Sequence, residues 1–216
     1  SYATPLVIDD DRQTVRAAEG ARPQLTTGGG VRITGDHAQF AGFVVNDAEE
    51  IGVGLECTGC ATYGVEVRST GTVQAENTRG ISVTGSTRAW VADSVVDTVR
   101  GGEGTRTAGL VIEQSEAPIV VGNVFANVTG GDRGGLGAGV YLSDVTRIRL
   151  LRNTIRDIDG GEGQVAGAMQ LPANGGSAVG VGFDTVADGV IDGTTITGLD
   201  PGEGEGDGVA YGFFFT

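Results

Sequence analysis

The sequence predicts an all-β fold: a right-handed, single-stranded parallel β-helix, a solenoid of about six to seven coils with a short N-terminal cap. A repeat of about 30 residues runs through most of the chain, and apolar residues recur with a period of two within each repeat. The composition agrees, because 40 of the 216 residues are glycine and aromatic residues make up only 6%. We therefore divide the chain into a cap segment, residues 1–29, and a parallel β-helix, residues 30–216.

The repeat units begin at glycine residues and align when the sequence is compared with itself. The unit from Gly109 reads GLVIEQSEAPIVVGNVFANV, and the unit from Gly139 reads GVYLSDVTRIRLLRNTIRDI. The remaining units start at Gly52, Gly80, Gly180 and Gly212. Successive starts are 28, 29, 30, 41 and 32 residues apart, and the extra length falls in glycine-rich, mostly acidic loops. Length variation confined to one corner is typical of a solenoid.

Each unit is expected to form three short strands joined by corners. Val140 and Leu142 alternate with polar or exposed neighbours, whereas helical spacing is not sustained anywhere from residue 30 onward. Strands this short cannot bury their apolar side alone, so each must pair with its equivalents in the next coils, at about 4.8 Å. We expect Leu110, Val140 and Val181 to occupy neighbouring rungs of one sheet. The unit-starting glycines would form a column that needs a positive φ or a close backbone approach.

The two ends of the chain differ from the repeat. Residues 1–29 do not match it; LVIDD predicts a lead strand, and RQTVRAAEG a short helical or irregular turn that covers the first coil. A solenoid needs such a cover because an open end exposes its core and its strand edges. At the other end Phe213, Phe214 and Phe215 are predicted as an assembly contact. Another copy, a different subunit or further residues of a longer surface protein would cover them.

A polar residue recurs two positions before an apolar one in successive units, as Asn153 does before Ile155. A side-chain amide at a tight inward bend can bond backbone groups that the strands leave free, and stacked amides bond one another. We predict a structural polar ladder formed by Ser94, Asn123, Asn153 and Thr194.

These features resemble a known repeat. The pattern N-x-I following G-V-x-L, at intervals of about 30 residues, is similar to the right-handed parallel β-helix repeat. Pectate-lyase-like enzymes, NosD-like periplasmic proteins and many bacterial surface proteins share that repeat. The resemblance covers residues 30–216 and is specific for the fold. It is weak for function, because this architecture carries many activities.

The charge of the chain argues against two classes of partner. The formal net charge is −14, and all 14 basic residues are arginine. Nucleic acids and anionic membrane surfaces need a basic stripe or patch, so neither is an expected partner. No apolar run reaches 18 residues, so we expect no membrane insertion. A start at Ser1 fits a processed chain, for example after removal of a signal peptide.

The only two cysteines, Cys57 and Cys60, lie in the sequence ECTGC. A redox pair of the thioredoxin type would open a helix in a βαβ unit, which the pattern does not predict, and one C-x-x-C is only half of a zinc site. We favour a local disulfide across a tight corner over free thiols. A disulfide would place the protein in an oxidising compartment.

The sequence offers no catalytic constellation, and we therefore predict no catalytic residues and lean away from an enzyme. There is no G-x-S-x-G motif, and a catalytic triad would have to use the single histidine, His37, which an exposed or loop-anchoring role explains better. The resemblance would imply N-x-D, D-D, G-H-G and R-x-K patterns in a pectin hydrolase. None is convincingly present: the only aspartate run is at residues 9–11, and there is no lysine.

The acidic loops are a candidate metal site, although the chain needs no cofactor otherwise. Stacked coils would bring their carboxylates to one edge, and a hard cation such as Ca²⁺ takes six to eight oxygen ligands. The alternative is that these loops are flexible and solvated. The predicted Ca²⁺ ligands are Glu103, Asp132, Glu162, Glu203, Glu205 and Asp207.

Three outward positions are candidate glycan contacts. Trp90 falls at an outward position of its unit, where it would stack on a sugar, join a protein contact or lie under a loop. Arg147 and Arg149 alternate on the outer face of a strand, and the alternative for them is a solvated face paired with nearby acids.

Together these features predict a non-catalytic structural β-helix at the cell surface, outside the cell or in the periplasm. It would associate end to end, with itself or with another β-helix or surface protein, into a filament or larger assembly. The alternative is a carbohydrate-active protein, a polysaccharide lyase or a glycan-binding module, that uses an outer strand face.

Overall fold

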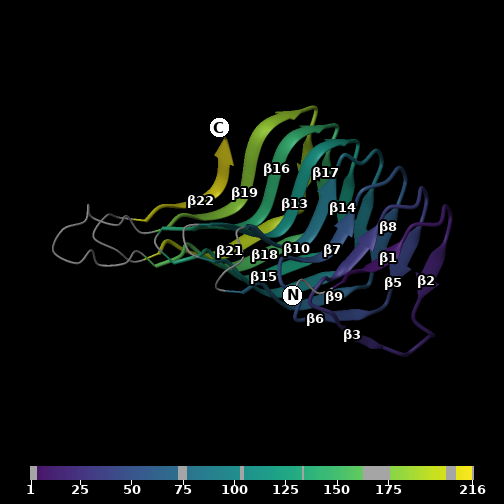
Figure 1. Ribbon diagram of the computed structural model, residues 1–216. Helices are drawn as coiled ribbons and strands as arrows, with labels where there is room; N and C mark the ends of the chain where they lie inside the picture. The colour runs from purple at the N-terminus through teal and green to yellow at the C-terminus, as the bar shows by residue number, and fades with distance from the viewer. Residues whose placement is uncertain are drawn as a thin grey trace.

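The computed structural model describes residues 4–72, 77–102, 105–132, 134–162, 176–202 and 208–215. Within these ranges the chain forms 22 strands, and none of it is helical. Consequently the described part holds no helix that could cross a membrane. Figure 1 shows the strands as a stack of similar coils that runs from the N-terminal end, in purple, to the C-terminal end, in yellow.

The strands form three sheets, which we call A, B and C, and all of their pairings are parallel. Sheet A contains β1 (Leu6–Ile8), β4 (Val31–Ile33), β7 (Ile51–Leu55), β10 (Asn77–Thr84), β13 (Arg106–Glu116), β16 (Leu136–Thr146), β19 (Ala178–Ala187) and β22 (Ala210–Phe215). Sheet B contains β2 (Thr14–Arg16), β5 (Gln39–Ala41), β8 (Ala61–Tyr63), β11 (Trp90–Ala92), β14 (Ile119–Val121), β17 (Arg149–Leu151) and β20 (Val190–Asp192). Sheet C contains β3 (Gln24–Thr26), β6 (Val44–Asn46), β9 (Glu66–Thr70), β12 (Val95–Arg100), β15 (Val124–Thr129), β18 (Thr154–Asp159) and β21 (Thr195–Asp200).

The strand order confirms the predicted solenoid. Each coil contributes one strand to each sheet, so the chain makes seven complete coils and then β22. Leu110 pairs with Val140, and Val140 pairs with Val181, as the repeat predicts. The chain is therefore a right-handed parallel β-helix.

The interior is one continuous apolar core that runs along the axis. Sheets A, B and C contribute, for example, Ile112, Val120 and Phe125, each with no exposed surface. Each of these side chains stacks on its equivalents in the coils above and below it. A core built from repeated aliphatic rungs suits a chain with few aromatic residues.

The first coil lies within the segment that the sequence analysis assigned to a cap. β1, β2 and β3 pair in register with β4, β5 and β6, so the predicted boundary at residue 30 marks no change of fold. The predicted helical or irregular turn over residues 12–20 contains β2 instead. The repeat is hard to recognise there because β2 and β3 each turn only one apolar residue inward, Val15 and Leu25. This coil covers the second coil as a cap would.

The unit-starting glycines stack in a column along sheet A because their backbones approach closely. None of them has a positive φ. A Cβ on Gly139 would overlap Ile155 Cγ2 and lie 2.8 Å from the carbonyl oxygen of Gly180. Gly109 has the same neighbours one coil earlier, Phe125 and the carbonyl oxygen of Gly139. Of the two reasons that the sequence allowed, close approach is the correct one.

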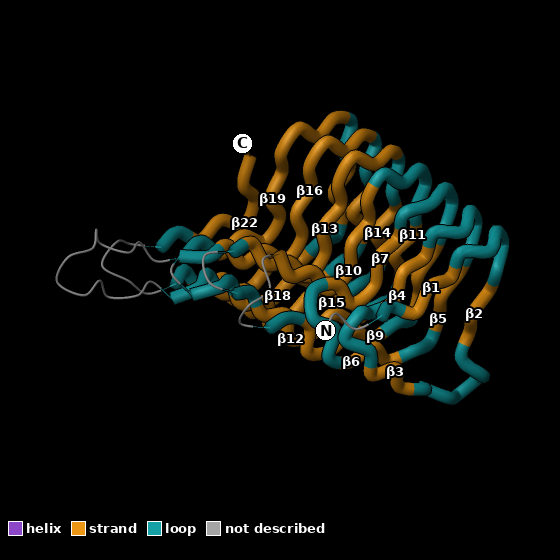
Figure 2. The backbone as a smooth tube through the Cα atoms, in the orientation of Figure 1, coloured by secondary structure: helices purple, strands orange, loops and turns teal. Residues whose placement is uncertain are grey.

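The glycine-rich loops of coils 4–7 follow sheet C and precede sheet A, so the described parts of these loops lie at one corner of the stack (Figures 1 and 2). Their described bases are packed without side chains. Gly135 N donates to Gly131 O at 2.9 Å, and Gly176 N donates to Gly161 O at 2.9 Å. A Cβ on Gly161 would overlap the carbonyl oxygen of Gly131. Glycine is therefore a packing requirement at these bases.

Candidate functional site

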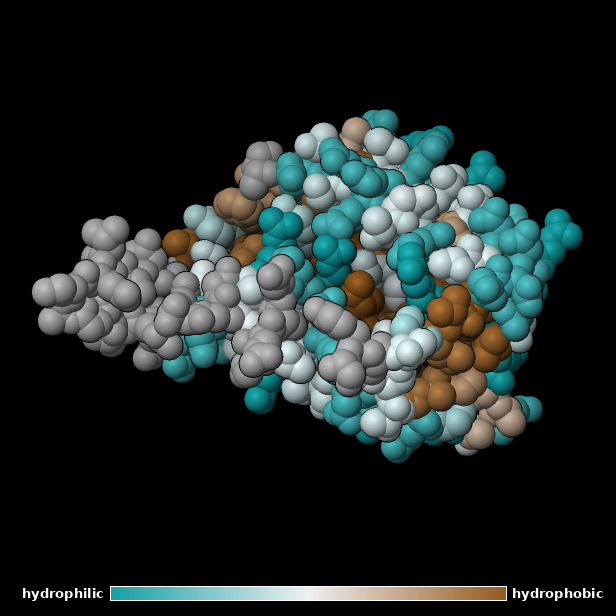
Figure 3. All heavy atoms as spheres, in the orientation of Figure 1, coloured by the Kyte–Doolittle hydropathy of each residue, from teal (hydrophilic) through white to brown (hydrophobic). Residues whose placement is uncertain are grey.

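The C-terminal end of the stack is an open apolar surface. Phe213 and Phe215 are 46% and 72% exposed, although they continue the interior columns of sheet A. Phe213 pairs with Val181, and Phe215 pairs with Phe183. Figure 3 shows apolar atoms reaching the surface near β22. The equivalent positions one coil earlier, Val181 and Phe183, are buried beneath β22.

A groove of about 460 Å³ opens beside β22 at the corner between sheets A and B. The rings of Phe183 and Phe215 stack along it with centroids 4.5 Å apart. Most of the lining is apolar, and it comprises Ile148, Phe183, Thr185, Val186, Gly189, Ile191 and Phe215. An apolar groove at the end of a sheet stack has the shape and chemistry to accept aliphatic side chains of another strand.

The predicted polar ladder lies at the corner between sheets B and C. Asn123 Nδ2 donates to Asn153 Oδ1 at 3.0 Å, and Asn123 Oδ1 accepts from the Ser94 backbone N–H at 2.9 Å. Asn123 Nδ2 also donates to the carbonyl oxygen of Val91 at 2.9 Å. Thr194 occupies the next rung, but its hydroxyl makes no hydrogen bond among the described residues.

A second polar ladder, which the sequence analysis missed, lies at the corner between sheets A and B. Ser86 N donates to Ser115 Oγ at 3.2 Å, and Ser86 Oγ donates to the Leu55 carbonyl oxygen at 3.1 Å. Ser86 Oγ also accepts from the Cys57 N–H at 3.2 Å. Both serines are buried. The 29-residue spacing of Ser86 and Ser115 is the sequence signal that could have found this ladder.

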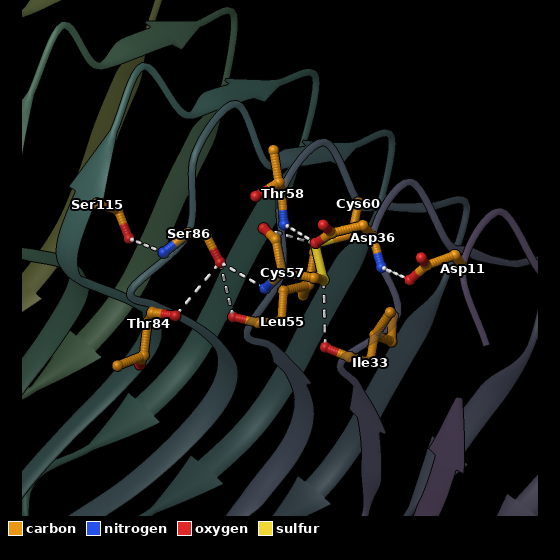
Figure 4. Close-up of a disulfide and its surroundings, with 10 residues drawn as sticks. All are labelled: Asp11, Ile33, Asp36, Leu55, Cys57, Thr58, Cys60, Thr84, Ser86 and Ser115. Carbon is orange, nitrogen blue, oxygen red and sulfur yellow. Dashed lines mark hydrogen bonds between the residues drawn. A yellow bond between two sulfur atoms is a disulfide. The ribbon is translucent and has the colours of Figure 1, made fainter. Parts of the chain in front are cut away.

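Cys57 and Cys60 form a disulfide on the rung that continues this ladder (Figure 4). Both cysteines are buried, and the corner that they close is held further by Thr58 N, which donates to Asp36 Oδ1 at 2.8 Å. Hydrogen bonds along three coils thus hold the same corner that the disulfide closes.

Removing the disulfide with the double substitution Cys57→Ala and Cys60→Ala should lower the free energy of unfolding by only about 2 kcal/mol, because the bond closes a very short loop. Urea unfolding followed by circular dichroism measures this. The oxidised native chain is the reference, and the native chain under reducing conditions should match the double variant. A loss as large as that expected for a buried core truncation would contradict the local role of the bond.

The predicted Ca²⁺ ligands are not brought together in the described part of the chain. Glu103, Glu203, Glu205 and Asp207 lie outside the described residues. Asp132 and Glu162 are described and exposed. No group of three potential metal ligands occurs in the described ranges. The Ca²⁺ site therefore stays a prediction.

One carboxyl group near these loops has a shifted pKa. Asp159 pairs with Asp200 in the next coil. Partial burial raises the pKa of Asp159 above its ordinary value, and the nearby carboxylates of Asp200 and Glu162 raise it further. Like charges stacked on neighbouring rungs are a destabilising arrangement that the acidic composition imposes.

Replacing Asp159 with asparagine should stabilise the chain at neutral pH. Folding raises the pKa of this carboxyl group, so its contribution to stability falls as pH rises through the window between the unfolded and folded pKa values. Thermal unfolding of the native chain and of Asp159→Asn, compared at pH 7 and pH 3.5, measures the difference. The gain should be much smaller at the lower pH, where the group is mostly protonated in both states. A gain that is equal at both values would contradict this cause.

The predicted glycan contacts lie on or beside the outer face of sheet B. Trp90 is 47% exposed and points outward from β11, as the alternation predicts. Arg149 is in the same column two coils further on, separated from Trp90 by Ile119. Arg147 is not on a strand: it lies at the corner before β17 with a φ of 57°, and it pairs with Glu116. The prediction that Arg147 lies on a strand is therefore wrong. Arg149 does lie on a strand, β17, and it makes no ion pair among the described residues.

Comparison with known proteins adds the following findings. No family model matches the chain, and no curated protein matches it. Among solved structures, the periplasmic alginate epimerase AlgG is similar at 12% identity and a TM-score of 0.29, over 94% of this chain and 55% of that one. Its T265N T268M double mutant gives 13% identity and a TM-score of 0.25, over 87% and 51% of the two chains. QnrB1, a plasmid-mediated fluoroquinolone resistance protein, is similar at 8% identity and a TM-score of 0.18, over 85% of this chain and 93% of that one.

The chain thus spans about half of the length of the AlgG structures. The sheets and ladders of the chain itself define it as a parallel β-helix solenoid. Similarities at these TM-scores assign no activity to it.

Proposed function

We propose that this chain is an exported structural β-helix that associates end to end through its open C-terminal coil. The observation that carries the proposal is the apolar end itself. Phe213 and Phe215 stand at interior positions yet are largely exposed, and an apolar groove lies beside them. Strand edges and apolar rungs left open in this way favour pairing with another coil.

The buried disulfide supports an oxidising location. Cys57 and Cys60 are bonded and closely packed, and such bonds persist mainly in periplasmic, extracellular and cell-surface proteins. An acidic exterior with a net charge of −14 keeps separate assemblies soluble and discourages association through the sides of the stack.

The substitution Phe215→Glu tests the proposal, because it places a charge on the open end without touching the buried coils. Light scattering after size-exclusion chromatography should show concentration-dependent association of the native chain and its loss in Phe215→Glu. Trp90→Ala is the matched control, since it removes an exposed aromatic side chain from sheet B, away from the end. Association that survives Phe215→Glu, or a native chain that stays monomeric at high concentration, would remove the proposal.

A second candidate function is glycan binding on the outer face of sheet B. The observation that favours it is the exposed Trp90 ring, which offers a stacking platform in the same column as Arg149, a residue without an ion pair in the described part of the chain. Binding to a panel of acidic polysaccharides, with and without Ca²⁺, tests it, together with ultraviolet detection of unsaturated products. Trp90→Ala and Arg149→Ala should each weaken binding, and absence of both binding and product would reject this candidate.

A further inference from the structure

The outer face of sheet C carries a column of left-handed residues. One residue in each of five successive strands, β9, β12, β15, β18 and β21, has a φ between 52° and 62°, and the regular pairing skips it. These residues are Ser69, Thr98, Asn127, Asp157 and Gly198. Because a left-handed residue interrupts an extended backbone, every strand bends at the same place. Asn127 lies at the centre of this column.

Asn127 begins a modification signal in the sequence. Residues 127–129 read Asn-Val-Thr, which is the N-x-T acceptor sequence for an N-linked glycan. No other asparagine of the chain is followed by serine or threonine two residues later. A sequence this short also occurs by chance, so the surroundings of Asn127 and Thr129 decide its meaning.

The side chain of Asn127 is exposed on the outer face of β15. Its Nδ2 donates a hydrogen bond to Asp97 Oδ1, at 2.6 Å, on the neighbouring strand β12. An amide nitrogen carries two hydrogens, so a sugar can replace one of them while the other keeps the bond to Asp97. By contrast, Asn123 is buried, and its amide nitrogen donates both hydrogens within the polar ladder. The amide of Asn127 is therefore accessible, and that of Asn123 is not.

Beside Asn127 the outer face of sheet C is hollowed. A trough of about 500 Å³ extends over β12, β15, β18 and β21, with Thr98, Asp157 and Gly198 in its lining. Asn127 and Thr129 both line it, so the two polar residues of the acceptor sequence border the same space. Gly198 has no side chain to fill the trough. A volume of this size is typical of sites that hold a small ligand, so the first sugars of a glycan have room here.

Two carboxyl groups in the trough suit a sugar. Asp159 and Asp200 line the trough and pair on neighbouring strands. Partial burial and, after it, the carboxylate of Asp200 raise the pKa of Asp159, which shows that the two groups repel each other. Sugar hydroxyl groups donate hydrogen bonds to carboxylates and add no charge, so a glycan in the trough would offset part of this repulsion.

We infer that Asn127 is an N-glycosylation site and that the first sugars of its glycan lie in the trough on sheet C. The inference rests on the export of the chain, which is one part of the proposed function, because N-linked glycans belong to exported proteins. It does not depend on end-to-end association. The site lies in the fifth coil, so a glycan there leaves Phe213 and Phe215 uncovered.

The sugar donor in this reaction is an oligosaccharide carried on a lipid phosphate, and a transferase supplies the base. Asn127 Nδ2 forms a bond to the anomeric carbon of the oligosaccharide. The bond between that carbon and the phosphate oxygen breaks, the lipid phosphate leaves, and Nδ2 gives up one proton to the base. No group is oxidised or reduced. The transfer takes place on the extended chain before the coil closes, and the folded coil then needs only to leave the glycan exposed.

Mass spectrometry of the chain isolated from its natural source tests the site. Cleavage after arginine releases residues 107–133 as one peptide, which contains Asn123 and Asn127. We expect this peptide to carry added hexose or N-acetylhexosamine units, and fragmentation that preserves the sugars should place them on Asn127. An unmodified peptide from a chain recovered outside the cytoplasm would overturn the inference and leave the proposed function standing. A chain recovered only from the cytoplasm would remove both.

Variants expressed in the same source separate glycosylation from other chemistry at Asn127. Thr129→Val keeps Asn127 and the volume of residue 129 but removes the hydroxyl group, so the added mass should be lost. Thr129→Ser restores a hydroxyl group and should restore the added mass, whereas Asn127→Gln should lose it. Circular dichroism checks that each variant keeps the native spectrum. Added mass that persists at the native level in Thr129→Val would contradict transfer to an N-x-T sequence and overturn the inference.

Discussion

Replacing Gly139 with alanine should lower the free energy of unfolding by about 3 kcal/mol, at the upper end of what overpacking costs in a protein core. The added methyl group would overlap Ile155 Cγ2 and lie 2.8 Å from the carbonyl oxygen of Gly180. Neither neighbour can withdraw freely, because Ile155 is fully buried and Gly180 is itself packed between coils. Thermal unfolding should show a midpoint lower by about 10 °C for a chain of this size.

Two glycines of sheet A serve as controls for Gly139→Ala. A Cβ on Gly54, in the third coil, would meet its nearest neighbour at an ordinary 3.8 Å, and neither this glycine nor Gly139 has a positive φ. A Cβ on Gly212, in the same column as Gly139, would meet nothing within 4 Å. Gly54→Ala and Gly212→Ala should therefore be tolerated. Equal losses in all three variants would show that a general preference for glycine, and not the stacking distance, governs this column.

Asn123→Ala should also cost about 3 kcal/mol, because it leaves buried backbone groups without partners and removes packed volume. The substitution deprives the Ser94 N–H of its acceptor and the Val91 carbonyl oxygen of a donor. Asn123 has 1% of its surface exposed, so water cannot replace these hydrogen bonds. Urea unfolding of the variant and the native chain measures the difference.

Asn46→Ala is the matched control for Asn123→Ala. Asn46 is partly exposed, and its amide makes one long hydrogen bond, of 3.5 Å, to Gln24 Oε1. Its loss should change the free energy of unfolding by less than about 1 kcal/mol, as is usual near a protein surface. If the two variants lose the same stability, the ladder does not hold the corner between sheets B and C.

Much of the fold could be predicted from the sequence because a solenoid repeats its solutions. Gly109, Gly139 and Gly180 recur at the same place in successive units, since the same steric problem recurs in every coil. The inward positions of Val140 and Leu142 follow from their alternation with outward neighbours. Even the partial ladder of Asn123 and Asn153 can be read from the spacing, because an amide is long enough to span two coils.

Other features gave a weaker signal for identifiable reasons. The strands of the first coil are three residues long, and one inward residue such as Val15 does not establish a period. Ser86 and Ser115 form a ladder, but serine is common, so its recurrence was not distinctive. Arg147 seemed to continue a strand, yet it adopts a φ of 57° at a corner where residues of many types do the same.

Left-handed residues mark the corners more precisely than the sequence pattern does. The residue two positions before each described strand of sheet B has a positive φ, and Asp93 and Arg152 hold the corresponding position before sheet C. Aspartate, asparagine and glycine accept this conformation readily, but arginine and alanine also occur here. Tertiary packing of the coils therefore sets these corners, and local preference contributes only in part.

Distances between spin labels along one column test the account most directly. Thr14, Ile119, Arg149 and Val190 occupy outward positions of a single column of sheet B, in coils 1, 5, 6 and 7. Double electron–electron resonance between Thr14→Cys and each of the other three positions, substituted in turn, should give distances of about 19, 24 and 29 Å, which rise by one coil spacing at each step. Distances that do not increase by equal steps would contradict the register of the coils, and with it the parallel β-helix and the proposed assembly.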